Sequence, residues 1–255
     1  MNLMLKDKVA IITGGGGGIG FSTAKLLAEE GCDIVIAEID IRKAKKAKKD
    51  IEKSTQRKVL ILQVDVSDKK QVENMVSETI KEFGKIDILV NNAGINIQGS
   101  VLTLSEESWD KVIDIDLKGI FLCSQSVAKE MVKRRQGKII NLCSSCSLEP
   151  GLGQVAYAAA KIGVRSLTRD FAYELGDKGI NVNGIIPGVT VSDMSRAVLN
   201  IDKKEKQEEW KNKNVLKRLG QPIDQAKVIL FLASHLSDHI TGECIITTAG
   251  AVMGQ

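Results

Sequence analysis

Three side chains near the middle of this 255-residue chain have the types and spacing of a proton-transfer site. Tyr157 and Lys161 stand at positions i and i+4 of an Ala-rich segment that is typical of a helix, so both side chains project from one face. Ser144 follows the strand-like apolar run 138–142, and parallel α/β sheets usually bind ligands beyond the carboxyl ends of their strands. A phenol, an ammonium and a hydroxyl are therefore expected to meet at one point.

Such a trio can exchange a proton with an oxygen atom of a substrate. A free tyrosine titrates at about pH 10, and lowering its pKa to about 7 requires roughly 4 kcal/mol of stabilisation of the phenolate. Lys161, as a fixed cation, supplies part of this, and Ser144 can hydrogen-bond the same substrate oxygen. Taken alone, the Y-x-x-x-K spacing is a weak signal, because a packed tyrosine beside a surface lysine gives the same pattern.

A second candidate site lies near the start of the chain. The β-branched run 8–13 is typical of a buried strand, and the glycine run 14–18 separates it from a helical pattern that includes Phe21. Glycines in this place let the backbone approach a pyrophosphate at a helix N-terminus. Glu38 ends the next apolar run, where an acidic side chain typically accepts hydrogen bonds from the adenosine ribose of a dinucleotide.

Together these motifs resemble the short-chain dehydrogenase/reductase family over essentially the whole chain. The resemblance is carried by T-G-x-x-x-G-I-G from Thr13, by N-N-A-G at 91–94, and by Ser144 followed by Y-x-x-x-K. It implies a doubly wound, Rossmann-type α/β fold with a mostly parallel seven-stranded sheet and helices on both faces. It also implies an NAD(P)-dependent oxidoreductase that interconverts a secondary alcohol and a ketone. Tyr157 would be the general acid/base, while Lys161 would lower its pKa and Ser144 would polarise the carbonyl.

The resemblance also implies a nicotinamide cofactor. Glu38 favours NAD, because its charge repels a 2′-phosphate and neither Gly17 nor Ile39 offers the basic group that the family uses for NADP. Arg42 and the lysines near it oppose this preference, so NADP stays open. Ser192 stands where the family has a threonine that binds the nicotinamide carboxamide. The expected cofactor-binding residues are Gly14, Gly18, Ile19, Gly20, Glu38, Asp65, Val66, Asn92, Ala93, Gly94, Tyr157, Lys161, Pro187, Gly188, Val189 and Ser192.

One catalytic position departs from the family pattern. In the segment that aligns with 109–121 the family carries an Asn, which helps to hold a water that relays protons from the lysine; here this residue is Asp116. An aspartate can hold a water too, but it adds a negative charge that can strengthen or reorient Lys161. Asp116 therefore joins Ser144, Tyr157 and Lys161 as a catalytic candidate. A cofactor-binding regulator without turnover is the alternative from another class.

Apolar periodicity and capping residues predict the remaining elements. Ser67 is the expected cap of the helix that follows the third strand, and a single long helix is expected over 105–136 with Ser105 at its start. Segment 189–214 mixes apolar and charged residues, which is typical of a mobile helical lid over the substrate or of an exposed partner surface. Further strands are predicted over 33–37, 58–64, 86–90, 180–186 and 244–247, and a helix that begins with proline over 222–233.

Length and composition narrow the class of protein. The 255 residues fit one dinucleotide-binding domain over 1–255, without an apolar run of about 18 residues or a signal-peptide layout, so a cytoplasmic enzyme is expected. The net charge is +4, and the basic run 42–49 is interpreted as the solvated face of a helix. A nucleic-acid binder that uses this run is the least favoured alternative.

Cysteine and histidine usage does not predict a metal site. The five cysteines come without a secretion signal, and the C-x-x-C of Cys143 and Cys146 lacks a second pair, although a redox role stays open. His235 and His239 are expected at a helix end or in a loop. The expected partners are a small-molecule alcohol or ketone and further copies of the chain in a homotetramer, as is typical of the family. An NADPH-dependent 3-oxoacyl-carrier-protein reductase is the alternative within the class.

Overall fold

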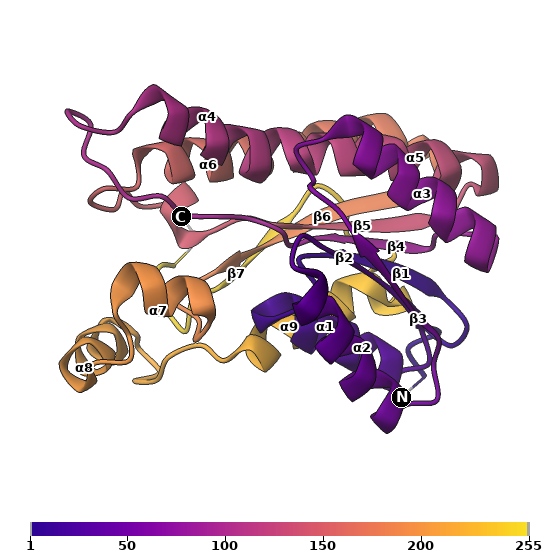
Figure 1. Ribbon diagram of the computed structural model, residues 1–255, viewed down its shortest axis with the longest axis horizontal. Coiled ribbons are helices and arrows are strands. Elements are labelled where there is room, and N and C mark those ends of the chain that lie inside the picture. The colour runs from indigo at the N-terminus through magenta and orange to yellow at the C-terminus, as the bar shows by residue number, and fades with distance from the viewer. Residues whose placement is uncertain (1, 254–255) are drawn as a thin grey trace.

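One seven-stranded sheet lies between two layers of helices in the computed structural model, which describes residues 2–253 (Figure 1). All neighbouring strands pair in parallel, in the order β3-β2-β1-β4-β5-β6-β7. The strands are β1 (Val9–Thr13), β2 (Asp33–Glu38), β3 (Val59–Gln63), β4 (Ile88–Asn91), β5 (Gly137–Leu142), β6 (Ile180–Pro187) and β7 (Cys244–Thr247). The predicted doubly wound fold is confirmed, and each predicted strand lies within about two residues of its observed bounds.

The helices cover both faces of the sheet, as the parallel topology requires. Figure 1 shows α3, α4, α5 and α6 along the upper face and α1, α2 and α9 along the lower one, with α7 and α8 apart at the left. Within residues 2–253, no helix is both long and apolar enough to cross a bilayer. The helices are α1 (Gly18–Glu29), α2 (Ile41–Ser54), α3 (Lys69–Phe83), α4 (Glu106–Ile113), α5 (Gly119–Arg134), α6 (Val155–Leu175), α7 (Asp193–Leu199), α8 (Lys204–Lys213) and α9 (Pro222–Ala233).

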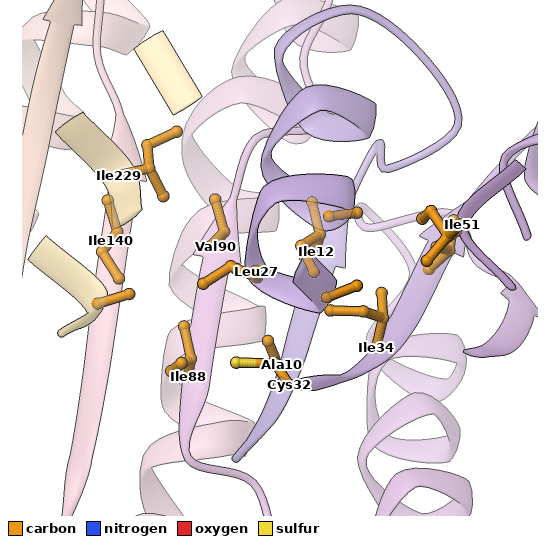
Figure 2. Packing of buried hydrophobic residues seen from close by; sticks show 14 of the residues in the cluster. Ala10, Ile12, Leu27, Cys32, Ile34, Ile51, Ile88, Val90, Ile140 and Ile229 are labelled. Atoms are coloured by element: carbon orange, nitrogen blue, oxygen red, sulfur yellow. The ribbon is translucent and has the colours of Figure 1, made fainter. Parts of the chain in front are cut away.

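Each central strand buries both of its faces, which explains the continuous apolar runs in the sequence. In β1, Ala10 and Ile12 belong to the cluster on the side of the sheet that α1 and α9 cover, with Leu27 near Ile12 and Ile229 beside Ile140 (Figure 2). The alternate residue Ile11 joins a second cluster with α3 and α5 on the opposite face. This two-sided core holds the strands in register, so their carboxyl ends form a firm edge for the loops.

The start of α3 shows a carboxylate as its cap where a hydroxyl was predicted. Asp68, not the predicted Ser67, caps α3, because its side chain accepts hydrogen bonds from the backbone N–H groups of Lys70 and Gln71. The hydroxyl of Ser67 instead donates to Asp65 at 2.6 Å. The prediction for Ser67 was therefore wrong by one residue.

The long helix predicted over 105–136 is interrupted. Ser105 caps α4 as expected, but the residues Asp114–Lys118 form a π-helical turn between α4 and α5. The regular helix ends before Arg135, which adopts a left-handed conformation with φ of 50°. A π-turn is a local insertion that apolar periodicity does not mark, and such turns often occur at functional sites. Here it contains Asp116, whose side chain is fully buried.

Candidate active site

A single cavity of about 430 Å³ brings the two candidate sites together at the carboxyl edge of the sheet. It extends from the glycine loop between β1 and α1 to the start of α6, so the motif residues of both halves share one space. Of the residues predicted for the site, Gly20 alone does not line the cavity. The predicted residues that do are Gly14, Gly18, Ile19, Glu38, Asp65, Val66, Asn92, Ala93, Gly94, Asp116, Ser144, Tyr157, Lys161, Pro187, Gly188, Val189 and Ser192.

The glycine loop bends tightly before it enters α1. Gly14 and Gly18 adopt left-handed backbone conformations, with φ of 63° and 53°. A Cβ on Gly20 would lie 2.3 Å from the carbonyl oxygen of Gly14 and 2.5 Å from the amide nitrogen of Asn92. Gly20 therefore lets the helix start pack behind the loop, and its predicted contact with a cofactor stays a prediction.

Asn92 joins the glycine loop to the end of β4. Its side-chain amide donates to the carbonyl oxygens of Thr13 and Gly14, at 2.9 and 3.0 Å. In return, the hydroxyl of Thr13 accepts from the backbone N–H groups of Asn92 and Ala93. The neighbouring Asn91 is buried and donates to Asn141 at 2.8 Å on β5. The N-N-A-G segment thus holds three strand ends and the loop in one fixed arrangement.

Glu38 closes the other side of the glycine loop. Its carboxylate accepts from the backbone N–H groups of Gly16 at 3.0 Å and Asp40 at 3.2 Å. Arg42, the basic residue noted in the sequence, pairs with Asp40 and is 88% exposed, and it does not line the cavity. Lys43 lines it instead and pairs with Asp193 at 2.9 Å. The sequence did not indicate which of these neighbours would face the cavity, because this depends on where α2 begins.

Ser144, Tyr157 and Lys161 converge as predicted. Ser144 is buried beyond the end of β5, and its hydroxyl accepts from the backbone N–H of Cys146 at 3.3 Å. The ammonium of Lys161 lies 5.4 Å from the ring centroid of Tyr157 and donates to the carbonyl oxygen of Leu142 at 3.2 Å. Both side chains come from the first turns of α6, so the i, i+4 spacing places them on one face.

Asp116 faces this trio from the π-helical turn. Its side chain is fully buried, with one carboxylate oxygen 2.8 Å from the backbone nitrogen of Ile95 and the other 3.1 Å from the Lys161 ammonium. Burial raises the pKa of Asp116, while Lys161 and the Ile95 N–H act in the opposite sense. The family resemblance implied that the residue at position 116 holds a water beside Lys161. The structure shows Asp116 in a direct ion pair with Lys161.

The surroundings of Tyr157 and Lys161 set their proton affinities. Burial raises the pKa of Tyr157 above its ordinary value and the nearby Asp116 raises it further, against the lowering effects of Lys161 and Ser144. Burial by itself lowers the pKa of Lys161, but the charges of Asp116 and Tyr157 outweigh it, so the pKa is raised and the ammonium persists. In the protein alone, Tyr157 is therefore a protonated phenol beside a permanent cation.

Several cavity-lining residues were not predicted individually as site residues. Cys146 donates from its thiol to the side-chain oxygen of Gln154 at 2.6 Å, and Trp210 reaches the cavity from α8. Loop conformation brings these residues in, and no fixed spacing predicts it. The residues that line the cavity from segment 189–214 are Val189, Thr190, Ser192, Asp193, Met194, Ser195, Val198, Leu199 and Trp210.

The cysteines of the C-x-x-C motif and His235 lie in the places described here. Cys143 and Cys244 are free thiols with their sulfur atoms 3.8 Å apart, and Cys146 is also free. His235 begins a short 3-10 turn after α9. Within residues 2–253, no group of three or more His, Cys, Asp or Glu side chains is arranged to hold a metal ion.

Comparison with known proteins gives the chain its family. A family model described as Enoyl-(Acyl carrier protein) reductase matches residues 14–251. The chain is 39% identical to the 3-oxoacyl-[acyl-carrier-protein] reductase FabG of Chlamydia muridarum, over 98% of this chain and 99% of that protein. It is also 39% identical to the (2S)-[(R)-hydroxy(phenyl)methyl]succinyl-CoA dehydrogenase subunit BbsD of Thauera aromatica, over 96% and 97%. The crystal structure of levodione reductase superposes with a TM-score of 0.93 at 33% identity, over 96% and 97% of the two chains. The chain belongs to the short-chain dehydrogenase/reductase family of oxidoreductases.

Proposed function

We propose that the protein interconverts a secondary alcohol and a ketone, with Tyr157 as general acid/base. The observation that carries this proposal is that Ser144, Tyr157 and Lys161 line the same cavity as the glycine loop. A proton donor and a dinucleotide cradle that share one space are what hydride transfer to a carbonyl requires.

The residues of the cavity fit a nicotinamide dinucleotide. A Cβ on Gly17 would meet no atom within 4 Å, so the loop faces open space at the N-terminus of α1, where diphosphates bind. When bound, the cofactor supplies or accepts the hydride. We propose that residues 14–20 hold the diphosphate, that Glu38 binds the adenosine ribose, and that Asp65, Val66 and 92–94 contact the adenosine. At the other half of the cofactor, Tyr157 and Lys161 would bind the nicotinamide ribose, and 187–189 with Ser192 would bind the nicotinamide.

Each polar side chain at the α6 end of the cavity has a distinct role in the proposed reaction. The Tyr157 hydroxyl gives its proton to the ketone oxygen, or takes it back from the alcohol. Ser144 donates a hydrogen bond to the same oxygen and so stabilises the charge that develops there. Lys161 holds a positive charge beside the phenol, at 5.4 Å from the ring centroid, which favours the phenolate once the proton has left.

We propose NAD as the cofactor. Support comes from Glu38, whose carboxylate stands at the end of β2 and is bound to two backbone N–H groups of the loop region. A 2′-phosphate there would meet this fixed negative charge. Lys43 is the basic side chain near Glu38 that lines the cavity, but its ammonium pairs with Asp193. NADP therefore remains the alternative.

We propose a 3-oxoacyl thioester and its 3-hydroxy product as the substrate class. The names of the two relatives at 39% identity, an acyl-carrier-protein reductase and a CoA-thioester dehydrogenase, support it. The apolar side chains of Met194, Val198, Leu199 and Trp210 line the cavity from α7 and α8 and suit an acyl chain. We propose that segment 189–214 acts as the substrate lid. The likeness to levodione reductase supports a small cyclic ketone as the second candidate.

Thermal stability with NADH and, separately, NADPH tests the cofactor assignment. A ligand at 100 times its Kd stabilises the folded state by about 2.7 kcal/mol, which is readily seen as a higher Tm. We expect the larger increase with NADH. A larger increase with NADPH would contradict the assignment of Glu38, and no increase with either would contradict the cofactor site itself.

Turnover is then tested with acetoacetyl-CoA and with levodione, using the cofactor that binds. Tyr157→Phe should lower the rate of ketone reduction by about a hundredfold to ten-thousandfold and leave the cofactor-dependent increase in Tm unchanged. An unchanged rate in this variant would remove Tyr157 from the reaction. Cofactor binding without turnover of either substrate would favour the regulator alternative.

A homotetramer also remains a proposal. Trp109 on α4, Phe121 on α5, and Ile162 and Tyr173 on α6 are exposed apolar or aromatic side chains on one helical layer, which supports burial against another copy. A single catalytic domain over 1–255 and a cytoplasmic location likewise stay predictions.

A further inference from the structure

The ion pair between Asp116 and Lys161 sets the charge of the reactive end of the cavity. Both side chains are buried, and their charged atoms lie 3.1 Å apart. They come from different elements, since Asp116 belongs to the π-helical turn and Lys161 to α6, which lies beside α4 and this turn (Figure 1). Such an arrangement holds the ammonium at one place rather than leaving it free to follow a ligand.

The contacts of both carboxylate oxygens of Asp116 favour its ionised form. One of its oxygens accepts from the Ile95 N–H at 2.8 Å, and the other faces the ammonium of Lys161. A protonated carboxyl would need an acceptor for its own hydrogen, yet both oxygens face donors. A Cβ on Gly94 would come within 2.9 Å of the second oxygen, so the carboxylate is also closely packed.

The pair changes what happens when Tyr157 loses its proton. Asp116 and Lys161 together carry no net charge, so a phenolate at Tyr157 leaves the buried group with a net negative charge. A neutral amide at position 116 would leave the ammonium of Lys161 unbalanced, and the phenolate would complete a neutral pair. The chain therefore carries the residue that stabilises the phenol over the phenolate.

We propose that Asp116 is a positioning residue that neutralises Lys161 and thereby keeps Tyr157 protonated up to a higher pH, in the form that ketone reduction uses. The inference rests on the proposed function, because it concerns the proton that Tyr157 gives to the ketone in that reaction. In ketone reduction the O–H bond of Tyr157 breaks and its proton joins the ketone oxygen. The hydride that forms the new C–H bond comes from the reduced nicotinamide, which leaves oxidised.

The other groups that face Tyr157 do not offset this charge. Cys146 approaches from the 3-10 turn after β5, and burial raises the pKa of its thiol, so it stays neutral. Ser144 contributes a hydroxyl from the same loop. Cys143, which faces Lys161, also has a raised pKa through its hydrogen bond with Cys244 and through burial. Asp116 is thus the anion that counts beside Lys161 and Tyr157.

The tyrosine content of the chain permits a direct test in the protein without cofactor. The chain has two tyrosines, and Tyr173 is 93% exposed. In a Tyr173→Phe background, the ultraviolet difference spectrum of the phenolate therefore reports Tyr157 alone as pH is raised. We expect Asp116→Asn to make Tyr157 titrate about one pH unit lower, a tenfold change in its acid constant.

Matched variants make the result specific. Asp114→Asn removes a carboxylate from the same turn that pairs with Lys118 at the surface, and it should leave the titration unchanged. If Asp116→Asn does not fold, as judged by its thermal transition, Asp116→Ser provides a second neutral side chain. Titration of Tyr157 at the same or a higher pH in the neutral variant would overturn the proposal.

Activity supplies an independent arm. The pH profiles of alcohol oxidation and of ketone reduction should both move to lower pH by about the same amount in Asp116→Asn, because both report the ionisation of Tyr157. A profile that does not move, with turnover intact, would contradict the proposal. Absence of turnover in the parent protein would instead count against the proposed function, and the titration would still decide the role of Asp116.

Discussion

At the scale of single residues, the site depends on close approaches that only certain side chains allow. Asn92 donates to the carbonyl oxygens of Thr13 and Gly14, and Gly20 leaves room for both Gly14 and this amide. The loop can therefore lie flat against the start of α1. A larger side chain at position 20 would push the loop away from the start of α1.

Gly20→Ala tests this packing. The added Cβ would lie 2.3 Å from the Gly14 carbonyl oxygen, so backbone must move, and we expect the free energy of unfolding to fall by about 1–3 kcal/mol. The matched control is Gly17→Ala, whose Cβ would meet no atom within 4 Å and whose φ of −162° any residue can adopt. Urea denaturation of both variants measures the difference. Equal losses in the two would show that the close approach at Gly20 is not the cause.

The residues of the site were predictable where chemistry is tied to short fixed spacings. The glycine loop, Glu38, Ser144, Tyr157 and Lys161 all face one cavity because each follows a strand end or shares a helix face. Gln154 was not predictable, since its place in the cavity depends on the conformation of the loop before α6. An effect of the Asp116 charge on Lys161 was predicted from the sequence, but the direct ion pair was not, because it depends on the π-helical turn.

At the scale of elements, capping residues and apolar periodicity predicted where most helices and strands begin and end. They did not predict which helix side chains face the cavity. Arg42 and Lys43 are neighbours in a basic run, yet Lys43 faces the cavity because Asp40 caps α2 and the helix begins at Ile41. The π-helical turn at Asp114–Lys118 shifts the phase within a helix that the sequence presented as continuous. A one-residue change of phase decides which side chain reaches the site.

Lys43 and Asp193 link α2 to the start of α7 across the mouth of the cavity, with their charged atoms 2.9 Å apart. Because both side chains are largely exposed, we expect Lys43→Ala and Asp193→Asn each to weaken NADH binding by about twofold to fivefold, and the double variant no more than one of them. Isothermal titration measures the Kd values. Lys206→Ala, which breaks an ion pair within α8 only, should change nothing. Additive losses in the double variant would contradict a link between α2 and α7.

At the scale of the whole molecule, the two edges of the sheet have separate tasks. The cavity lies at the carboxyl edge, and the amino edge contains a buried acidic residue that joins several elements. Asp87, just before β4, accepts from the backbone N–H of Val9 at 2.9 Å and pairs with Arg134 from the end of α5 at 3.0 Å. Lys8 and Lys85 complete its surroundings. The sequence predicted only where the strands begin at this edge. It did not predict the partners of Asp87, because residue type alone does not indicate which side chains an acid contacts.

Asp87→Asn should lower stability in a manner that depends on pH. Burial alone would raise the pKa of Asp87, but the Val9 N–H, Arg134 and the two lysines outweigh it, so the pKa lies below its ordinary value. A lowered pKa in the folded state means that the carboxylate stabilises the protein fully above the unfolded pKa of about 3.9, and that this contribution is lost as pH falls through the folded pKa. We expect the variant to lose about 3 kcal/mol of unfolding free energy near neutral pH, because it removes the buried carboxylate with which three partly exposed cations pair.

Urea denaturation of parent and variant at a series of pH values, from neutral down to about pH 3, measures this effect. The gap between the two proteins should be constant down to about pH 5 and should narrow below it. Asp238→Asn, which removes an exposed carboxylate paired with Lys138 near the same edge, is the control and should cost about 1 kcal/mol or less. A gap that is as large at about pH 3 as at neutral pH would show that Asp87 acts through shape and not charge. Because the cavity lies at the opposite edge, cofactor binding per folded molecule should be unchanged in both variants.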